Sequence, residues 1–265
     1  MLEAGFDVTL YEIGSCVGGL WVYNNDNQRS SAYKTLHINT ARDLTAFSDH
    51  PFRPDVQPFP NHRDMATYLR SYAERFGLVS RVRFNTRITR VNAAASYTPE
   101  KPRWQLETEH GETHEHDTVI VASGHLTKPL EVPMFRDGFK GRYLHSHYYK
   151  DPAEFAGQRI CVVGVGNSAL DIASDVCPAA ERAVLVARSR PLIIPKLMFA
   201  GRSGIWPSLS TSRGCRWRCA TVCCASLYGW CRATSASSVF RRRARRFTLR
   251  PTPTSSTIST IAAWW

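Results

Sequence analysis

The sequence predicts an α/β fold with two dinucleotide-binding, Rossmann-like domains, both incomplete, followed by an irregular C-terminal segment. Three observations predict this fold. A strand, a glycine turn and the start of a helix follow one another in Arg159–Ala173, and an apolar strand that ends in an acid lies at Val8–Glu12. From residue 203 onward, the chain shows neither the helical nor the strand period of a packed domain.

The turn Gly164–Ala169 follows a short apolar run, Ile160–Val163, of the kind that a parallel strand buries on both faces. Gly164 permits a tight turn, Gly166 lets the backbone approach a pyrophosphate, and the small Ala169 lets the helix pack close to the strand. The N–H groups and the dipole at the helix start favour phosphates. We therefore predict a dinucleotide site here, the alternative being an ordinary strand-to-helix turn.

The next strand indicates which dinucleotide this turn would bind. The apolar run Ala183–Ala187 ends in Arg188, Ser189 and Arg190. An NAD site would have an Asp or Glu about 20 residues after the first glycine, to bind the ribose 2′-hydroxyl. Arginine suits a 2′-phosphate instead, through charge-assisted and often bidentate contacts. The sequence thus favours NADP(H), the alternative being that the arginines only face solvent at a strand end.

The N-terminal region is typical of a βαβ unit whose first strand and glycine loop would precede the chain. Leu2–Ala4 fit the last turn of a helix, with Gly5 as its C-terminal cap. The following strand ends at Glu12, the position where an acid binds a pair of ribose hydroxyls. We therefore expect a second dinucleotide-binding unit, of which the chain contains the end of the helix and the second strand.

Two loops follow this unit. The first, Gly18-Gly19-Leu20-Trp21, has paired glycines, which permit close approach of the backbone to a ligand. The second is a short mixed segment, Tyr33–Asn39, that leads to Asn39 and Thr40. We treat both loops as candidate contacts of a bound cofactor.

The remaining elements alternate between helix and strand, as in a mixed α/β domain with an inserted meander. Asn61 can cap a helix that runs to about Gly77 with apolar residues on one face. The pattern further predicts a strand over Val82–Val91, a hairpin of Trp104–Glu109 and Thr113–His116, and a buried strand over Asp117–Gly124.

Charge and cysteine divide the chain into two parts. Of 265 residues, 34 are Lys or Arg and 22 are Asp or Glu, and every acid lies at or before Glu181. The net charge of +12 therefore belongs to the C-terminal third, which excludes a nucleic-acid partner for the protein as a whole. No run of 18 uncharged apolar residues predicts a membrane span, and the first residues do not resemble a signal peptide, which favours a cytoplasmic location.

The segment 203–265 is basic and rich in Ser, Arg, Cys and Trp, and we expect it to be disordered. Five of the eight cysteines lie in it, at spacings that match no zinc site and no disulfide framework, so we expect no metal. We hypothesise that it is out of frame with its parent gene from about Ser203. The alternative is that Arg241–Arg246 forms a nucleic-acid or targeting patch.

The segment Phe139–Tyr149, FKGRYLHSHYY, fits the pattern F-x-G-x-x-x-H-x-x-x-Y/F. Together with the glycine turn that follows it, this segment makes residues 1–202 resemble the flavin-containing monooxygenases, a class of NADPH-dependent flavoprotein oxygenases. The related Baeyer–Villiger monooxygenases usually have Trp at the last position, and Tyr149 argues against them.

The resemblance implies a partial FAD-binding domain at 1–125, a linker with a partial NADPH-binding domain at 126–202, and a tail outside the family at 203–265. It implies that Asn39 is the catalytic residue, which orients groups around the flavin and the bound NADP. The positions implied to contact the two cofactors, FAD and NADP(H), are Glu12, Gly18, Gly19, Leu20, Trp21, Asn39, Thr40, Ser123, Gly124, His145, Gly164, Gly166, Asn167, Ser168, Ala169, Asp171, Arg188, Ser189 and Arg190.

The activity that the resemblance implies is the transfer of one oxygen from O2 to a small molecule with a soft nitrogen or sulfur nucleophile, by way of a flavin C4a-hydroperoxide. Because no glycine-rich FAD loop is found, we expect little or no activity from this polypeptide. An inactive NADP-binding fragment and a Baeyer–Villiger relative remain alternatives. A disulfide reductase is disfavoured, because Cys16 has no partner at a redox spacing.

Overall fold

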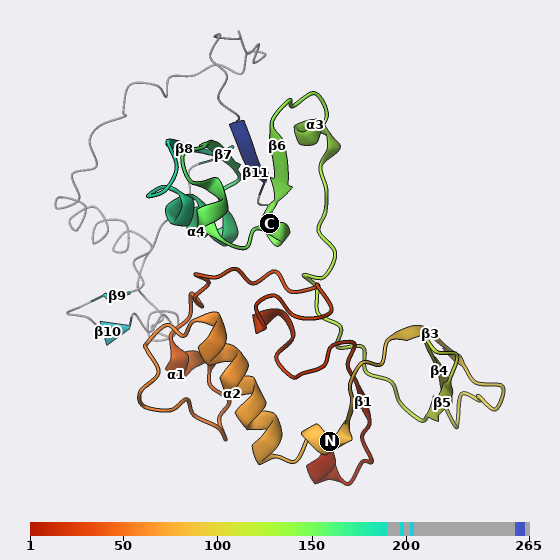
Figure 1. Ribbon diagram of the computed structural model, residues 1–265. Coiled ribbons are helices and arrows are strands. Elements are labelled where there is room, and N and C mark those ends of the chain that lie inside the picture. The colour runs from red at the N-terminus through yellow and green to blue at the C-terminus, as the bar shows by residue number, and fades with distance from the viewer. Residues whose placement is uncertain (190–196, 199–201, 204–257, 263–265) are drawn as a thin grey trace, which may run out of the picture. The chain divides into compact units, whose positions relative to one another are not determined.

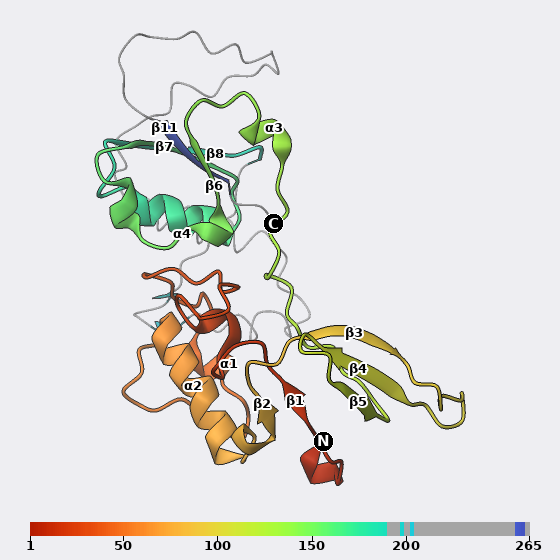
Figure 2. The same cartoon turned by 45° about the vertical axis from the view of Figure 1, so that its right-hand side comes forward.

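A computed structural model describes residues 1–189, 197–198, 202–203 and 258–262, and its elements confirm a mixed α/β fold (Figures 1 and 2). A four-stranded parallel sheet has the order β6-β11-β7-β8, with α4 against it. Its strands are β6 (Arg142–His145), β7 (Arg159–Val163), β8 (Arg182–Val186) and β11 (Ile258–Ala262), and α4 spans Asn167–Val176. A pair of short antiparallel strands, β9 (Leu197–Met198) and β10 (Arg202–Ser203), is separate.

Strand β7 packs its alternate residues against α4. Ile160 and Val162 are at most 2% exposed, and the helix side chains Ile172 and Val176 are fully buried against them. The prediction that β7 is buried on both faces is wrong, because burial alternates along the strand and Cys161 stays half-buried. In the described part of the chain, α4 covers one face of the sheet, and a strand points successive side chains to opposite faces.

The C-terminal segment was expected to be irregular, but it contains strand β11, which pairs in parallel with both β6 and β7. The run from Ile258 to Ala262 is rich in β-branched residues, which favour strands. Between β6 and β7 its backbone gains a hydrogen-bonding partner on each side. This pairing accounts for regular structure in a region whose sequence has no extended period.

The first part of the chain has little parallel sheet. Strand β1 (Leu10–Tyr11) pairs in parallel with β2 (Val82–Arg83), and β3 (Ile88–Ala93), β4 (Trp104–Thr108) and β5 (Thr113–His116) form an antiparallel meander. The hairpin is thus confirmed. The prediction of one strand over Val82–Val91 is wrong, because Asn85 has a φ of 52°, a left-handed conformation that ends β2 before β3 begins.

The predicted buried strand over Asp117–Gly124 is also wrong. The segment forms no strand, and Ile120 and Val121 are 67% and 80% exposed. A strand is stabilised by pairing with a neighbour, and none of the described strands pairs with this run. Its apolar residues therefore remain at the surface.

Helix α2 (His62–Arg75) confirms the predicted helix and its cap. Asn61 accepts hydrogen bonds from the backbone N–H groups of Arg63 and Asp64, and Asp64 accepts one from the Asn61 N–H. This reciprocal capping box satisfies orphan donors at the helix start. The buried face carries Met65, Tyr68 and Ala73. The short helices are η1 (Leu2–Ala4), η2 (Gly19–Trp21), α1 (Arg42–Thr45), η3 (Val79–Arg81), α3 (Pro133–Arg136), η4 (Ser146–Tyr148) and η5 (Pro152–Phe155).

The predicted helix cap at Gly5 is confirmed as well, because Gly5 has a φ of 80° and ends η1.

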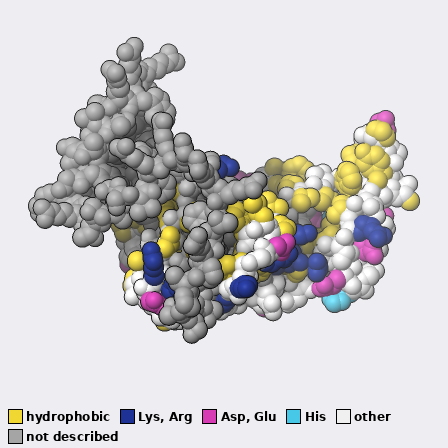
Figure 3. All heavy atoms as spheres, turned by 90° about the horizontal axis from the view of Figure 1, so that it is seen from above, with side chains coloured by type: hydrophobic (Ala, Val, Ile, Leu, Met, Phe, Trp, Pro, Cys, Tyr) yellow, Lys and Arg dark blue, Asp and Glu magenta, His cyan; other side chains and the backbone are white. Residues whose placement is uncertain are grey.

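On the face shown in Figure 3, basic and acidic side chains of the described residues are interspersed among hydrophobic ones. No helix among the described residues is long and apolar enough to cross a bilayer.

Substitution of Phe155 tests the packing of the core beside α4. It is fully buried, stacks on Tyr149 at 5.6 Å between ring centroids, and lies under the Arg142 guanidinium at 5.1 Å. We expect Phe155→Ala to lower the free energy of unfolding by about 3 to 5 kcal/mol, because it removes packing and leaves a cavity. Urea unfolding would measure the change, with Phe6→Ala as the matched control, since Phe6 is 56% exposed. Equal losses in both variants would contradict this assignment.

Three buried histidines predict a pH dependence of stability. Burial is the largest cause that lowers the pKa of His62, His145 and His147. As the pH falls below about 6.5, the ordinary pKa of histidine, the unfolded chain binds protons that the folded chain does not. Stability should therefore be lost below pH 6.5 and continue to fall toward the lower folded-state pKa values. Thermal unfolding at pH 7.5 and 5.5 would measure the loss, and a smaller loss is expected in His62→Gln.

Candidate nucleotide-binding site

The glycine turn at the end of β7 has a backbone conformation that favours glycine at its first position. Gly164 has a φ of 121°, a region that favours glycine, and its N–H donates to the carbonyl of Val186 at 2.9 Å. Gly166 is the N-cap of α4, and no side chain caps this helix. Ala169 is fully buried against the sheet, as a small third residue requires. The N–H groups of the first helical turn thus suit an anion.

Further candidate contacts lie on α4 and after β8. Asn167 is exposed, and Ser168 and Asp171 are half-buried on the first turns of α4. Arg188 and Ser189 are exposed just past β8. Because β7 and β8 are parallel neighbours, their carboxyl ends lie at the same edge of the sheet, which is where dinucleotides bind. Arg190, the other predicted 2′-phosphate contact, lies outside the described residues.

The predicted flavin-side loop is held by its own hydrogen bonds. Glu12 Oε1 accepts a hydrogen bond from the Gly14 N–H at 2.7 Å, which fixes the carboxylate that is predicted to bind ribose. A Cβ on Gly14 would lie 2.9 Å from the side-chain end of Asn27, so a larger residue there would displace the neighbouring side chains. Gly14 therefore lets the Glu12 side chain and the following loop approach closely.

The paired glycines sit in the same loop and both have positive φ, 136° at Gly18 and 52° at Gly19. A Cβ on Gly18 would lie 2.7 Å from Val22. Leu20 and Trp21 complete η2, which packs on α2 and is half-buried. The backbone therefore favours glycine at the first position.

Asn39 and Thr40 are exposed and lie between two backbone anchors. The Ile38 N–H donates to the Pro60 carbonyl and the Arg42 N–H donates to the Pro58 carbonyl, both at 2.8 Å. These two bonds hold the Asn39–Thr40 pair against the loop that leads to α2. An exposed amide on a rigid backbone can present its donor and acceptor to a ligand.

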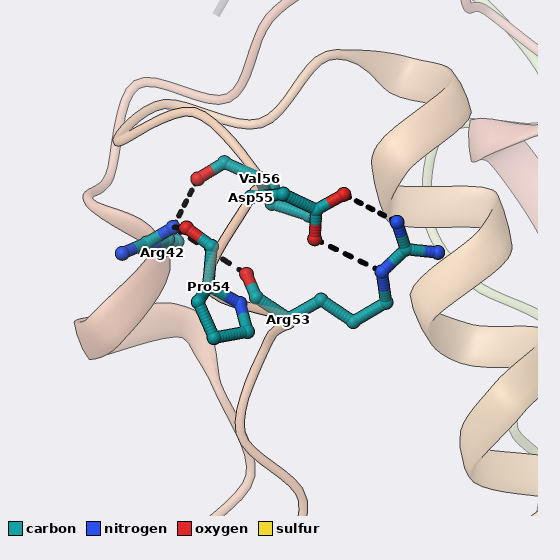
Figure 4. Close-up of polar contacts among 5 residues, drawn as sticks. All are labelled: Arg42, Arg53, Pro54, Asp55 and Val56. Carbon is teal, nitrogen blue, oxygen red and sulfur yellow. Dashed lines mark hydrogen bonds and ion pairs between the residues drawn. The ribbon is translucent and has the colours of Figure 1, made fainter.

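The side chain of Arg42 strengthens this anchor (Figure 4). Its Nη1 donates to the carbonyls of Pro54 at 2.9 Å, Arg53 at 3.4 Å and Val56. Arg53 in turn forms an ion pair with Asp55. The Arg42 guanidinium thus contacts three carbonyls of the loop before Pro58. Arg42 lies on the same short stretch as Asn39, so these contacts also hold that stretch.

The other predicted contacts differ in exposure. His145 is buried, and its Nδ1 accepts a hydrogen bond from the His147 N–H at 3.1 Å. Burial lowers the pKa of His145, consistent with a neutral ring that acts as an acceptor. Ser123 and Gly124 are exposed, and Gly124 has a φ of 73°.

The described residues bring together two groups of predicted contacts, one in the loops of residues 12–40 and one at the start of α4. The described part of the chain places no three His, Cys, Asp or Glu side chains where they could hold a metal ion. Sequence reasoning missed the polar residues that join the groups, Tyr33, Thr35, Lys150 and Asp175. Nothing in the local sequence around these residues marks them as contacts.

Comparison with known proteins connects this arrangement to one family. The profile of the FMO-like family, described as flavin-binding monooxygenase-like, matches residues 1–239. Flavin-containing monooxygenase 5 of Rattus norvegicus is 36% identical over 205 residues, which cover 74% of this chain and 38% of the relative. Flavin-containing monooxygenase 1 of Canis lupus familiaris is 32% identical over 208 residues, 76% of this chain and 39% of the relative. The chain thus spans under two-fifths of the length of these relatives.

Solved structures agree with the sequence relatives. S-allyl-L-cysteine S-oxygenase from Allium sativum is 28% identical, with a TM-score of 0.61 over 76% of this chain and 50% of that chain. A steroid monooxygenase bound to NADP is 25% identical, with a TM-score of 0.52 over 76% of this chain and 38% of that chain. The predicted cofactors, FAD and NADP(H), agree with a flavin-binding family and an NADP-bound neighbour. The chain belongs to the flavin-binding monooxygenase-like family of enzymes.

Proposed function

We propose that this chain takes part in an NADPH- and FAD-dependent monooxygenation, in which one atom of O2 is added to a nitrogen or sulfur nucleophile of a small molecule. The observation that carries the proposal is the glycine turn Gly164–Ala169, which opens the uncapped helix α4 within the matched family region. The name of the garlic relative, an S-oxygenase, supports sulfur as one acceptor. A soft nucleophile needs no catalytic base, so the residues of the chain chiefly bind and orient.

On the nucleotide side, the backbone at the start of α4 would bind the pyrophosphate of NADP(H). Arg188 and Ser189, at the end of β8, would hold the 2′-phosphate, with a guanidinium as the charged partner. Ser168 and Asp171 would contact the nucleotide from the first turns of α4.

On the flavin side, Glu12 would bind ribose hydroxyls, and the Gly18–Trp21 turn would lie against the cofactor. When bound and reduced, a flavin supplies the reactivity toward O2. Asn39 and Thr40 would donate and accept hydrogen bonds that orient the groups around it. Ser123, Gly124 and His145 would line the connection between the two cofactor sites.

A second candidate is a protein that binds NADP but does not oxygenate. The glycine turn that opens α4 favours this candidate, because its backbone N–H groups suit a nucleotide phosphate whether or not a flavin is bound. In this case the nucleotide affinity would resemble that of the family, and FAD would be bound weakly. The two candidates differ in flavin content and in NADPH-driven oxygen use.

We expect NADP+ to bind more tightly than NAD+, and Arg188→Ala to weaken NADP+ by about tenfold through loss of a charged hydrogen bond. Isothermal titration of the purified chain with each nucleotide would measure both affinities. Arg182→Ala is the control, because Arg182 is exposed at the opposite end of the same strand. Equal losses for NADP+ and NAD+ would show that Arg188 does not read the 2′-phosphate.

Asn39→Ala should uncouple NADPH oxidation from oxygen transfer, because the amide would no longer orient groups at the flavin. The ratio of oxygenated product to NADPH consumed would be measured for the chain loaded with FAD, and at the aligned residue of a full-length relative. Asn92→Ala, an exposed asparagine on β3, is the control. An unchanged ratio in Asn39→Ala would remove this role. NADP+ binding with no bound flavin would favour the non-oxygenating candidate.

A further inference from the structure

Helix α4 carries two aspartates one turn apart, and both accept hydrogen bonds from a segment far away in the sequence. Tyr33 Oη donates to Asp171 Oδ2 at 3.1 Å, and Thr35 Oγ1 donates to Asp175 Oδ2 at 2.7 Å. Residues four apart lie on the same side of a helix. The segment Tyr33–Thr35 therefore lies along one side of α4.

Tyr149 adds a part-buried hydrogen bond to this contact. Its Oη donates to the same Asp175 Oδ2 at 2.5 Å, and its ring meets that of Tyr33 edge-on at 5.4 Å between centroids. Tyr149 is fully buried and Tyr33 is 6% exposed. Burial, reinforced by the neighbouring aspartates, raises the pKa of both phenols, so both remain protonated donors at working pH.

Lys150 and Asp151 hold the same segment through further hydrogen bonds and an ion pair. Lys150 Nζ donates to the carbonyls of Ser30 at 2.6 Å and Ala32 at 3.0 Å, and the Lys34 N–H donates to the Lys150 carbonyl at 2.9 Å. Lys34 also pairs with Asp151 at 2.9 Å. We call the bonds of Tyr33 and Thr35 to Asp171 and Asp175 the clasp.

Each end of the clasp lies on an element that carries one group of candidate contacts. Asp171 lies on the second turn of α4, which opens at the nucleotide turn. Thr35 lies four residues before Asn39, on a backbone that Ile38 anchors to Pro60. The hydroxyl of Tyr33 sets the orientation of the Asp171 carboxylate, and Asp171 is itself a candidate nucleotide contact.

We propose that Tyr33 and Thr35 are positioning residues, which through Asp171 and Asp175 couple nucleotide binding at α4 to the order of the segment that carries Asn39. The inference rests on the proposed binding of NADP(H) at the start of α4. Coupling between two sites is reciprocal. If the docked segment favours nucleotide binding, bound nucleotide favours the docked segment.

Hydrogen exchange with and without NADP+ tests this coupling in the purified chain. The amides of Lys34, Leu36 and Ile38 are useful probes because all three donate backbone hydrogen bonds. In the wild type, we expect NADP+ to slow exchange in peptides from both 33–38 and 167–176. In the double variant of Tyr33→Phe and Thr35→Val, the slowing should persist in 167–176 and disappear in 33–38.

The affinity for NADP+ provides the reciprocal measurement. The double variant should bind NADP+ about fivefold more weakly, at the lower end of usual coupling factors. Tyr148→Phe is the control, because Tyr148 is 51% exposed and adjacent to Tyr149. It should leave both exchange and affinity unchanged, and circular dichroism would show that all variants are folded.

The outcomes separate this inference from the proposed function. If NADP+ binds and slows exchange in 33–38 equally in the wild type and the double variant, the coupling is overturned and the proposed function stands. If NADP+ slows exchange only in 167–176 of the wild type, the coupling is likewise overturned. If NADP+ does not bind the wild-type chain, the proposed function and the coupling both fall.

Discussion

The two-sided attachment of helix α4 is the constraint on which the candidate site depends. One side of the helix buries Ile172 and Val176 against β7, and another presents Asp171 and Asp175 to hydroxyl donors. Apolar packing attaches the helix to the sheet through contacts that are not themselves directional. The hydrogen bonds add direction, since each needs a donor at a set distance and angle.

Glycine conformation sets the geometry at both groups of candidate contacts. Gly164 and Gly18 both have φ above 100°, a region that side chains rarely adopt. At Gly18 the neighbouring Val22 also excludes a Cβ. Two loops distant in the sequence therefore use the same backbone device.

Local features of the sequence were sufficient to predict the elements that local forces determine. The capping residue Asn61 and the apolar period after it predicted α2, and the glycine turn predicted the junction of β7 and α4. Elements that depend on partners were less predictable. The run Asp117–Gly124 has the composition of a strand, but a strand requires a neighbour, and composition does not say whether one is present.

The contacts between Tyr33 and Asp171 and between Thr35 and Asp175 could not be predicted for the same reason. They join residues 138 and 140 positions apart, and neither side chain is unusual in its local sequence. The break within Val82–Val91 was missed for a local reason instead. Alternation alone does not reveal that Asn85 adopts a left-handed conformation, although asparagine tolerates it better than most residues.

Arg42 has a consequence for how this region can vary among related sequences. Its guanidinium contacts the carbonyls of Arg53, Pro54 and Val56, and every amino acid supplies a carbonyl. Side chains in that loop can therefore change without removing the contact. The three contacts all use one nitrogen, Arg42 Nη1, so they depend on a donor at the end of a long side chain, which most amino acids do not supply. One side chain thus holds a loop through contacts that do not depend on the side chains of that loop.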